Sequence, residues 1–176
     1  DFLNYSRPAP MRMQVIDFDQ LVHDAVDVFS QDKKVIDRGI TISFEGVGPV
    51  HILADHARMK QVIWNLLTNA EQSMDSGKIE VELTAMLASS RPTVDLVIRD
   101  EGSGISKEDL QRIFEPFFTT KERGTGLGLA VMHRIIEDHD GNISVDSTVG
   151  KGTSFSITLP MTAPDLSELR EETDAG

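Results

Sequence analysis

Hydrophobic residues recur along this chain with two different periods, and the order of the two predicts an α/β fold. Three segments have apolar residues on one face at about 100° per residue, which is typical of helices packed on a core. These segments cover about residues 17–39, 55–74 and 126–141. In shorter runs, apolar and polar residues alternate, as in strands with one buried face. The runs lie near residues 40–44, 50–53, 79–87, 94–98, 143–145 and 155–159.

The predicted helix over residues 55–74 carries polar residues beside its apolar face. Asn65 and Asn69 point the same way, one turn apart. Amides on a helix are often plain surface residues. Their place next to a strongly apolar face favours the floor of a groove instead, where a neutral amide oxygen suits Mg²⁺ whose charge is already balanced by phosphate.

Asp100 is the most distinctive polar residue, because strand parity places it on the same buried face as Ile98. A buried carboxylate needs hydrogen-bond donors, and an adenine amino group would supply one. Gly102 and Gly104 would let a flat ligand approach the backbone. An Asp at this place can also cap the following turn. The presence of Asn69 and of later glycines favours the ligand interpretation.

A second glycine-rich run, Gly124-Thr125-Gly126-Leu127-Gly128, leads into a predicted helix. The free N–H groups at a helix start, together with the positive end of its dipole, can receive a phosphate. The run has neither the Gly-x-Gly-x-x-Gly spacing of dinucleotide folds nor the Gly-Lys-Ser/Thr of a P-loop. Lys121 and Arg123 come just before it, either as phosphate contacts or as ordinary surface charges.

The charge balance excludes several classes of partner. Against 17 Lys and Arg residues stand 29 Asp and Glu residues, which gives a formal charge of −12. We therefore expect no nucleic-acid partner and no direct membrane contact from this chain. The chain has no cysteine, so neither a disulfide framework nor a thiolate metal site is expected. No apolar run approaches the ~20 residues of a membrane span.

The 176 residues are enough for one substantial core, which we expect over residues 15–161. Residues 1–14 contain Pro8 and Pro10 after an apolar stretch, and are predicted to link this domain to an upstream helix. The acidic residues 162–176 are predicted to form a flexible tail. The chain begins with Asp1 rather than Met, so a fragment of a longer protein is expected.

Five segments in order resemble the catalytic ATP-binding domain of sensor histidine kinases, within the superfamily that also holds gyrase, MutL and the heat-shock chaperone ATPases. They are Arg58–Met74 (the N box), Asp100–Ile105 (the first glycine box), Ile113–Lys121 (the F box), Gly124–Leu129 (the second glycine box) and Val149–Phe155 (the Gly-x-Gly-Thr turn). The resemblance covers residues 55–160. Two departures are Gln72, where many members have Lys, and Asp140, where Gly is frequent.

The resemblance implies a Bergerat-type ATP-binding fold, a two-layer α/β sandwich in which helices cover one face of a mixed sheet. It implies ATP between the helices, under a lid from about Phe118 to Gly126, with adenine recognised by Asp100. It also implies Mg²⁺ held by Asn69 with Asn65 nearby, and Asn65, Asn69 and Lys121 as catalytic residues. The implied nucleotide contacts are Asn69, Asp100, Gly102, Gly104, Ile105, Lys121, Arg123, Gly124, Thr125, Gly126, Leu127, Gly128 and Thr153.

The function implied by the resemblance is transfer of the ATP γ-phosphate to a histidine on a separate domain. A first alternative is a conformational ATPase of the gyrase or MutL type. Those relatives place a Glu base four residues before the Mg²⁺-binding Asn, whereas this chain has Asn65, which cannot take a proton from water. A second alternative is a nucleotide-sensing adaptor module, whose degenerate members lose the residues that this chain retains.

The resemblance also implies partners. They are the parent protein's own dimerisation and phosphoacceptor domain, upstream of this chain, and the receiver domain of a response regulator. The parent is expected to be a phosphorylated homodimer, with this part in the cytoplasm; anchoring of the parent in the inner membrane is left open. The pair His23-Asp24 superficially resembles a phosphoacceptor motif, but lacks its downstream Pro pattern and is interpreted as a surface pair.

Overall fold

The computed structural model describes residues 10–88, 90–122 and 124–163. The strands are β1 (Met13–Asp17), β2 (Ile40–Glu45), β3 (His51–Asp55), β4 (Gly77–Met86), β5 (Thr93–Asp100), β6 (Asn142–Thr148) and β7 (Gly152–Pro160). The helices are α1 (Phe18–Ser30), α2 (Lys33–Asp37), α3 (His56–Gln72), α4 (Lys107–Leu110) and α5 (Gly128–Asp138).

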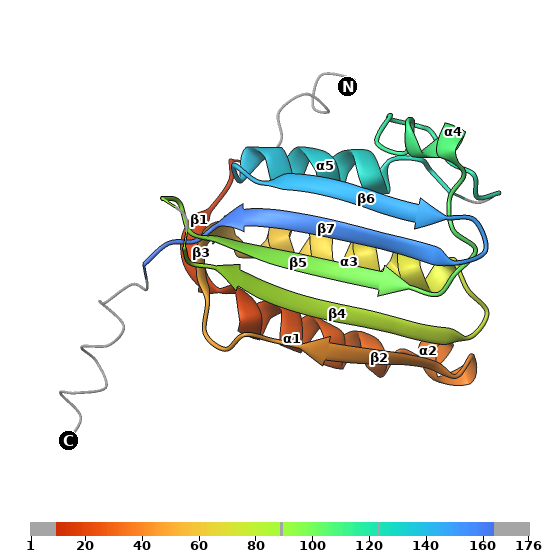
Figure 1. Cartoon of the computed structure of the whole chain (residues 1–176), viewed down its shortest axis with the longest axis horizontal. Helices are drawn as coiled ribbons and strands as arrows, with labels where there is room; N and C mark the ends of the chain where they lie inside the picture. The colour runs from red at the N-terminus through yellow and green to blue at the C-terminus, as the bar shows by residue number, and fades with distance from the viewer. Residues whose placement is uncertain (1–9, 89, 123, 164–176) are drawn as a thin grey trace, which may run out of the picture.

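The main sheet has the strand order β2-β4-β5-β7-β6, and α1, α3 and α5 pack side by side on one of its faces (Figure 1). The pair β2–β4 is parallel and the other pairs are antiparallel, so the sheet is mixed. The predicted two-layer α/β sandwich, covered on one face by helices, is confirmed. β1 and β3 form a separate antiparallel ribbon at the edge where α1 and α3 begin.

Short polar side chains fix where the helices begin. Asp17 accepts from the Gln20 N–H at the start of α1, and Ser106 accepts from the Asp109 N–H at the start of α4. Such side chains replace the missing helical partners of the first N–H groups. At the start of α3, Asp55 accepts from the N–H groups of Arg58 and Arg12, at 3.1 Å and 2.8 Å.

Two sequence predictions need correction at the N-terminal side. The helix predicted to run to Gly39 is divided, because Asp32 accepts from the Lys34 N–H and starts the short α2. Gly39 follows α2 with φ +64°, so the predicted stop is right. Residues 13 and 14, assigned to the linker, belong to β1, which pairs with β3 over its whole length. Each residue of β1 pairs with a residue at least 34 positions further along the chain, so local patterns do not reveal the pairing.

The predicted apolar face of α3 forms the centre of the core. All its members are buried: Met59, Val62, Ile63, Leu66, Leu67, Ala70 and Met74. They face the inner sheet residues, among them Leu96 and Ile98 of β5. Asp100 is next on the same side of β5 and is 9% exposed, as strand parity predicts. The buried face of the central strand β5 therefore ends in the carboxylate of Asp100.

His139 joins the C-terminal end of α5 to the start of α3. Its Nε2 accepts from the Asp55 N–H at 3.0 Å, and its Nδ1 donates to the Ile135 carbonyl at 2.7 Å. The ring is buried and both its nitrogens have partners, so His139 has a structural role. Asp140 follows with φ +56°, in the left-handed region where Gly is the freer residue.

Most of the predicted linker and tail falls outside the part of the chain that the structure describes. Residues 1–9 and 164–176 lie outside the described residues. At the C-terminal side, Met161 and Thr162 donate backbone hydrogen bonds to Pro92 and His51. Among the described residues, no helix combines the length and the apolar character needed to cross a membrane.

Candidate functional site

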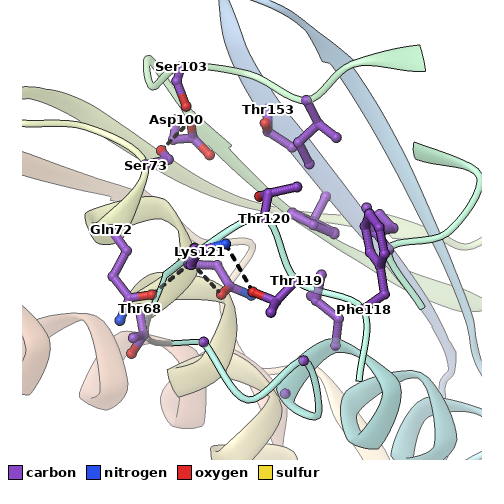
Figure 2. A pocket seen from close by; sticks show the side chains of 18 of the residues that line it. Thr68, Gln72, Ser73, Asp100, Ser103, Phe118, Thr119, Thr120, Lys121 and Thr153 are labelled. Carbon is purple, nitrogen blue, oxygen red and sulfur yellow. Dashed lines mark hydrogen bonds between the residues drawn. The ribbon is translucent and has the colours of Figure 1, made fainter. Parts of the chain in front are cut away.

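A cavity of about 770 Å³ opens between the second half of α3, the end of β5 and the start of α5. The segment before α5 forms part of its wall, as predicted for a lid (Figure 2). Most of the predicted contacts line this one cavity although they come from distant parts of the chain. They are Asn69, Asp100, Gly104, Ile105, Lys121, Gly124, Thr125, Gly126, Gly128 and Thr153.

Three of the predicted residues that the structure describes are not among those that line the cavity. Asn65 is half-buried one turn before Asn69, but the cavity reaches along α3 only as far as Thr68. Gly102 and Leu127 also lie outside the lining. Arg123 is outside the described residues. The structure therefore separates Asn65 from the pocket that holds Asn69.

The first glycine loop packs closely against neighbouring segments, and its residues Gly104 and Ile105 also line the cavity. A Cβ on Gly102 would lie 1.9 Å from the Ser73 hydroxyl, and one on Gly104 would lie 2.2 Å from the Thr148 carbonyl oxygen. Gly104 also has φ +72°. These glycines let the loop come close to α3 and to the β6–β7 hairpin. Their missing side chains make room for neighbouring chain segments, and the expectation that they also admit a flat ligand stays a prediction.

Asp100 is held in a defined orientation at the end of β5. Its Oδ1 accepts from the Gly102 N–H at 2.8 Å and from the Ser73 hydroxyl at 3.0 Å. Burial raises the pKa of the Asp100 carboxyl above its ordinary value, against these two hydrogen bonds, which lower it. An ionised carboxylate has about four acceptor positions. Asp100 thus retains the capacity to accept from a ligand in the cavity that it lines.

The start of α5 lies beside the cavity. Leu127 occupies the N-cap position and makes no side-chain cap hydrogen bond. Gly126, Gly128 and Leu129 line the cavity. A Cβ built on Gly128 would meet no atom within 4 Å, so this glycine borders open space. An anion can approach the N–H groups of this helix turn closely.

Lys121 crosses from the lid segment to α3. Its Nζ donates to the Gln72 Oε1 at 2.7 Å and to the Asn69 Oδ1 at 3.3 Å, as the dashed lines in Figure 2 show. Partial loss of water at this end lowers the pKa of Lys121, while the carboxylates of Glu71 and Asp100 act to raise it. Two neutral amide oxygens therefore converge on a positive charge. The described residues contain no cluster of three or more His, Cys, Asp or Glu side chains able to hold a metal ion.

Sequence reasoning missed several lining residues, and their signals differ. Thr68 and Ser73 flank Asn69 on α3, and the spacing of Ser73, four residues after Asn69, places them on one helix face. Helical periodicity was enough to find Ser73. Other missed residues come from loops and the core, where composition carries no such signal. They are Ser103, Ile113, Phe118, Thr119, Thr120, Leu129 and Phe155.

The comparisons of this chain with known proteins find relatives that agree with one another in family. Residues 54–163 match the family model described as "Histidine kinase-, DNA gyrase B-, and HSP90-like ATPase". Sporulation kinase E of Bacillus subtilis is 36% identical over 92% of this chain, and sensor histidine kinase ZraS of Escherichia coli K12 is 37% identical over 92%. The chain spans 21% and 34% of the lengths of these two proteins.

Solved structures agree in fold. Full-length ShkA, in complex with AMPPNP, matches 91% of this chain with a TM-score of 0.78 and 25% identity, over 33% of its own chain. Histidine kinase ThkA, in complex with the response regulator protein TrrA, matches 92% of this chain with a TM-score of 0.73 and 29% identity, over 45% of its own chain. With its mixed sheet, its helices on one face and its ordered motifs, the chain belongs to the histidine kinase-, DNA gyrase B- and HSP90-like ATPase family, on its sensor histidine kinase branch.

Proposed function

We propose that this chain binds Mg²⁺–ATP and presents its γ-phosphate to a histidine on a separate domain. The observation that carries the proposal is the single cavity that joins Asp100, Asn69, Lys121 and the open start of α5. A buried acceptor at one place and cationic or N–H donors at another match the two ends of a nucleoside triphosphate. ShkA, a similar structure, is a complex with AMPPNP.

Each end of the nucleotide has its own group of residues. Asp100 accepts from the adenine amino group, and its orientation is fixed by Ser73 and Gly102. The backbone N–H groups around Gly128 receive phosphate oxygens. Asn69 offers the hard, neutral oxygen that Mg²⁺ uses beside phosphate. The same oxygen already accepts a hydrogen bond from the positively charged Lys121 Nζ. Bound Mg²⁺ would neutralise phosphate charge.

The chain's role in the reaction is to position the γ-phosphate and balance its charge. A ring nitrogen of the acceptor histidine forms the new P–N bond, the bond to the β–γ bridging oxygen breaks, and ADP leaves while the imidazole loses a proton. Such transfer depends on alignment and electrostatics more than on a protein base. Asn65 is not a base and lies outside the cavity lining, which disfavours the alternative of water activation and hydrolysis.

An exposed apolar patch beside the lid supports a separate phosphoacceptor domain as partner. It consists of Phe117, Leu127 and Val131, which are 76%, 39% and 40% exposed. Leu127 and Val131 are one turn apart at the start of α5, and the Phe117 N–H donates to the Gly126 carbonyl. Phe117 has φ +68°, which is rare for a bulky residue and indicates a functional constraint. An acceptor helix on this patch would face the phosphate end of the cavity.

The remaining parts of the proposal concern the parent protein. We propose that it is a cytoplasmically exposed homodimer whose phosphohistidine is passed to a receiver domain, on the analogy of ThkA with TrrA. His23 of α1 is not the acceptor, because its ring sits among the carboxylates of Asp24 and Asp27, which would repel an incoming phosphate.

Incubation with radiolabelled ATP tests the proposal. The chain alone should remain unlabelled and release little phosphate, since the acceptor domain is not included. Addition of the parent's upstream helical hairpin should produce a label that is stable in base and lost in acid, as a phosphoramidate is. Phe117→Gly should weaken this labelling while leaving nucleotide affinity unchanged. Rapid hydrolysis by the chain alone would favour the gyrase-type alternative, and failure to bind nucleotide would exclude both.

A further inference from the structure

The contact between Lys121 and Gln72 connects the lid segment to α3 across 49 residues of sequence. Gln72 and Asn69 are three residues apart on α3, so their side chains lie next to each other. Both amide oxygens accept from the same Nζ atom. All three residues line the cavity. The cation of the lid is thus held at the end of the helix that also offers the proposed metal ligand.

The two hydrogen bonds of Lys121 differ in length. The distance to Gln72 Oε1 is 2.7 Å, typical of a strong charge-assisted hydrogen bond, whereas the distance to Asn69 Oδ1 is 3.3 Å, near the outer limit. An ammonium group has three donors. After these two contacts one donor remains for an anionic ligand in the cavity. Gln72 is therefore the main fixed partner of the lid cation.

The same geometry creates competition at Asn69. A divalent ion binds an amide oxygen at about 2.0–2.1 Å and repels an ammonium group bound to the same oxygen. The contact with Asn69 is the weaker one and is lost first. The contact with Gln72 uses a different oxygen, so it can persist.

We propose that Gln72 is a positioning residue, which keeps the ammonium group of Lys121 at the phosphate end of the cavity while Asn69 is taken by the metal. The proposal rests on the proposed function and specifies one part of it. Helix α3 has no cation of its own at position 72, and the lid supplies one at the same place. The ammonium group of Lys121 therefore serves as the one positive charge at positions 72 and 121.

An exchange of the two side chains tests this idea directly. The Nζ of Lys121 lies 2.7 Å from the Gln72 Oε1. A Lys side chain reaches one bond further from the backbone than a Gln side chain. Gln72→Lys thus brings its own ammonium group close to the place that Lys121 occupies. The double variant Gln72→Lys with Lys121→Gln again has one ammonium group and one amide, but α3 now supplies the ammonium group and the lid segment supplies the amide.

Calorimetry with a non-hydrolysable ATP analogue, with and without Mg²⁺, should show the predicted pattern. Gln72→Met and Lys121→Gln should each weaken binding of the analogue about tenfold, and adenosine binding should be unaffected. The double variant Gln72→Lys with Lys121→Gln should recover to within about threefold of the original affinity. Gln61→Met and Lys60→Gln are matched controls on α3, about three turns earlier, and should have no effect.

A second measurement needs no nucleotide. The Gln72 amide oxygen holds the Lys121 Nζ by a hydrogen bond of 2.7 Å, so Gln72→Met should free this group and increase the rate at which Lys121 is acylated, measured by peptide mass spectrometry. Lys60 serves as an internal reference in the same sample. Thermal unfolding of each variant establishes that the fold is retained.

The two measurements separate the two proposals. If the original chain fails to bind nucleotide, the proposed function is wrong, and the acylation rates still report the contact. If the original chain binds, Gln72→Met binds equally well and the double variant is no better than Lys121→Gln, the positioning role of Gln72 is wrong. Unchanged acylation of Lys121 in Gln72→Met would also overturn it.

Discussion

The two glycine-rich loops beside the cavity have similar composition but different hydrogen-bond partners. The first, residues 101–105, is tied to distant segments: Ser103 N–H donates to Ser73, Gly150 N–H donates to Ser103, and Ile105 N–H donates to the Ser147 hydroxyl. The second, residues 124–128, makes local hydrogen bonds and borders open space at Gly128. Glycine permits close packing in both loops, at Gly102 and Gly104 and again at Gly124 and Gly126, whereas Gly128 leaves open space for a ligand.

The largest effect is expected at Gly104. Gly104→Ala places a methyl group against the Thr148 carbonyl oxygen and forces a side chain to φ +72°. We expect a loss of about 3 kcal/mol or more in the free energy of unfolding, measured by urea denaturation. Gly150→Ala is the matched control, because Gly150 has φ +77° but no atom within 4 Å of the new Cβ. It should cost only about 1–2 kcal/mol. Equal losses would contradict the packing role of Gly104.

Asp100→Asn tests the adenine end of the cavity. The amide can present a donor where the carboxylate only accepts, so we expect affinity for an ATP analogue to fall tenfold to a hundredfold, or about 1–3 kcal/mol. Burial raises the pKa of Asp100, which means that its charge destabilises the folded state at neutral pH. The variant without nucleotide should therefore unfold at a higher temperature. Asp95→Asn, on the same strand but outside the cavity lining, is the control.

Asp55 is a second buried carboxylate, and its pKa is shifted in the opposite direction to the pKa of Asp100. The N–H groups of Arg12 and Arg58 hold the pKa of Asp55 below its ordinary value. A lowered folded-state pKa contributes stability above the unfolded value of about 4, and this contribution is lost as pH falls through the folded value. Asp55→Ala, which removes the cap of α3 together with the charge, should lower the free energy of unfolding by about 1–2 kcal/mol at pH 7. In denaturation curves recorded from pH 7 down to acid, this difference should shrink; a constant difference would assign it to packing alone.

The smallest change in stability is expected at Gly128. Gly128→Ala adds a methyl group in open space at the start of α5, so the fold should be unchanged or more stable by up to about 1 kcal/mol. The same methyl group should hinder the approach of phosphate and weaken analogue binding about tenfold. Calorimetry and thermal unfolding on the same sample measure both. Unchanged affinity would mean that the second loop does not contact the ligand.

Much of the fold follows from local patterns. The apolar face of α3, the alternation in β4 and β5, and the caps Asp17 and Ser106 all depend on residues a few positions apart. Such patterns act before tertiary structure exists. The strand β1 was missed because its partner β3 lies far along the chain. Pairing between distant segments leaves no periodic signal within either one.

The sequence by itself determined the elements, the buried place of Asp100 and the set of motifs that identifies the family. Only the tertiary structure decided which of these residues share the cavity. It includes Asn69 but stops before Asn65, and it turns Gly102 toward Ser73. It also brings Lys121 to Gln72, across 49 residues. The physical reason is that helix and strand formation depend on neighbours in sequence, whereas a cavity is the space left when distant elements pack.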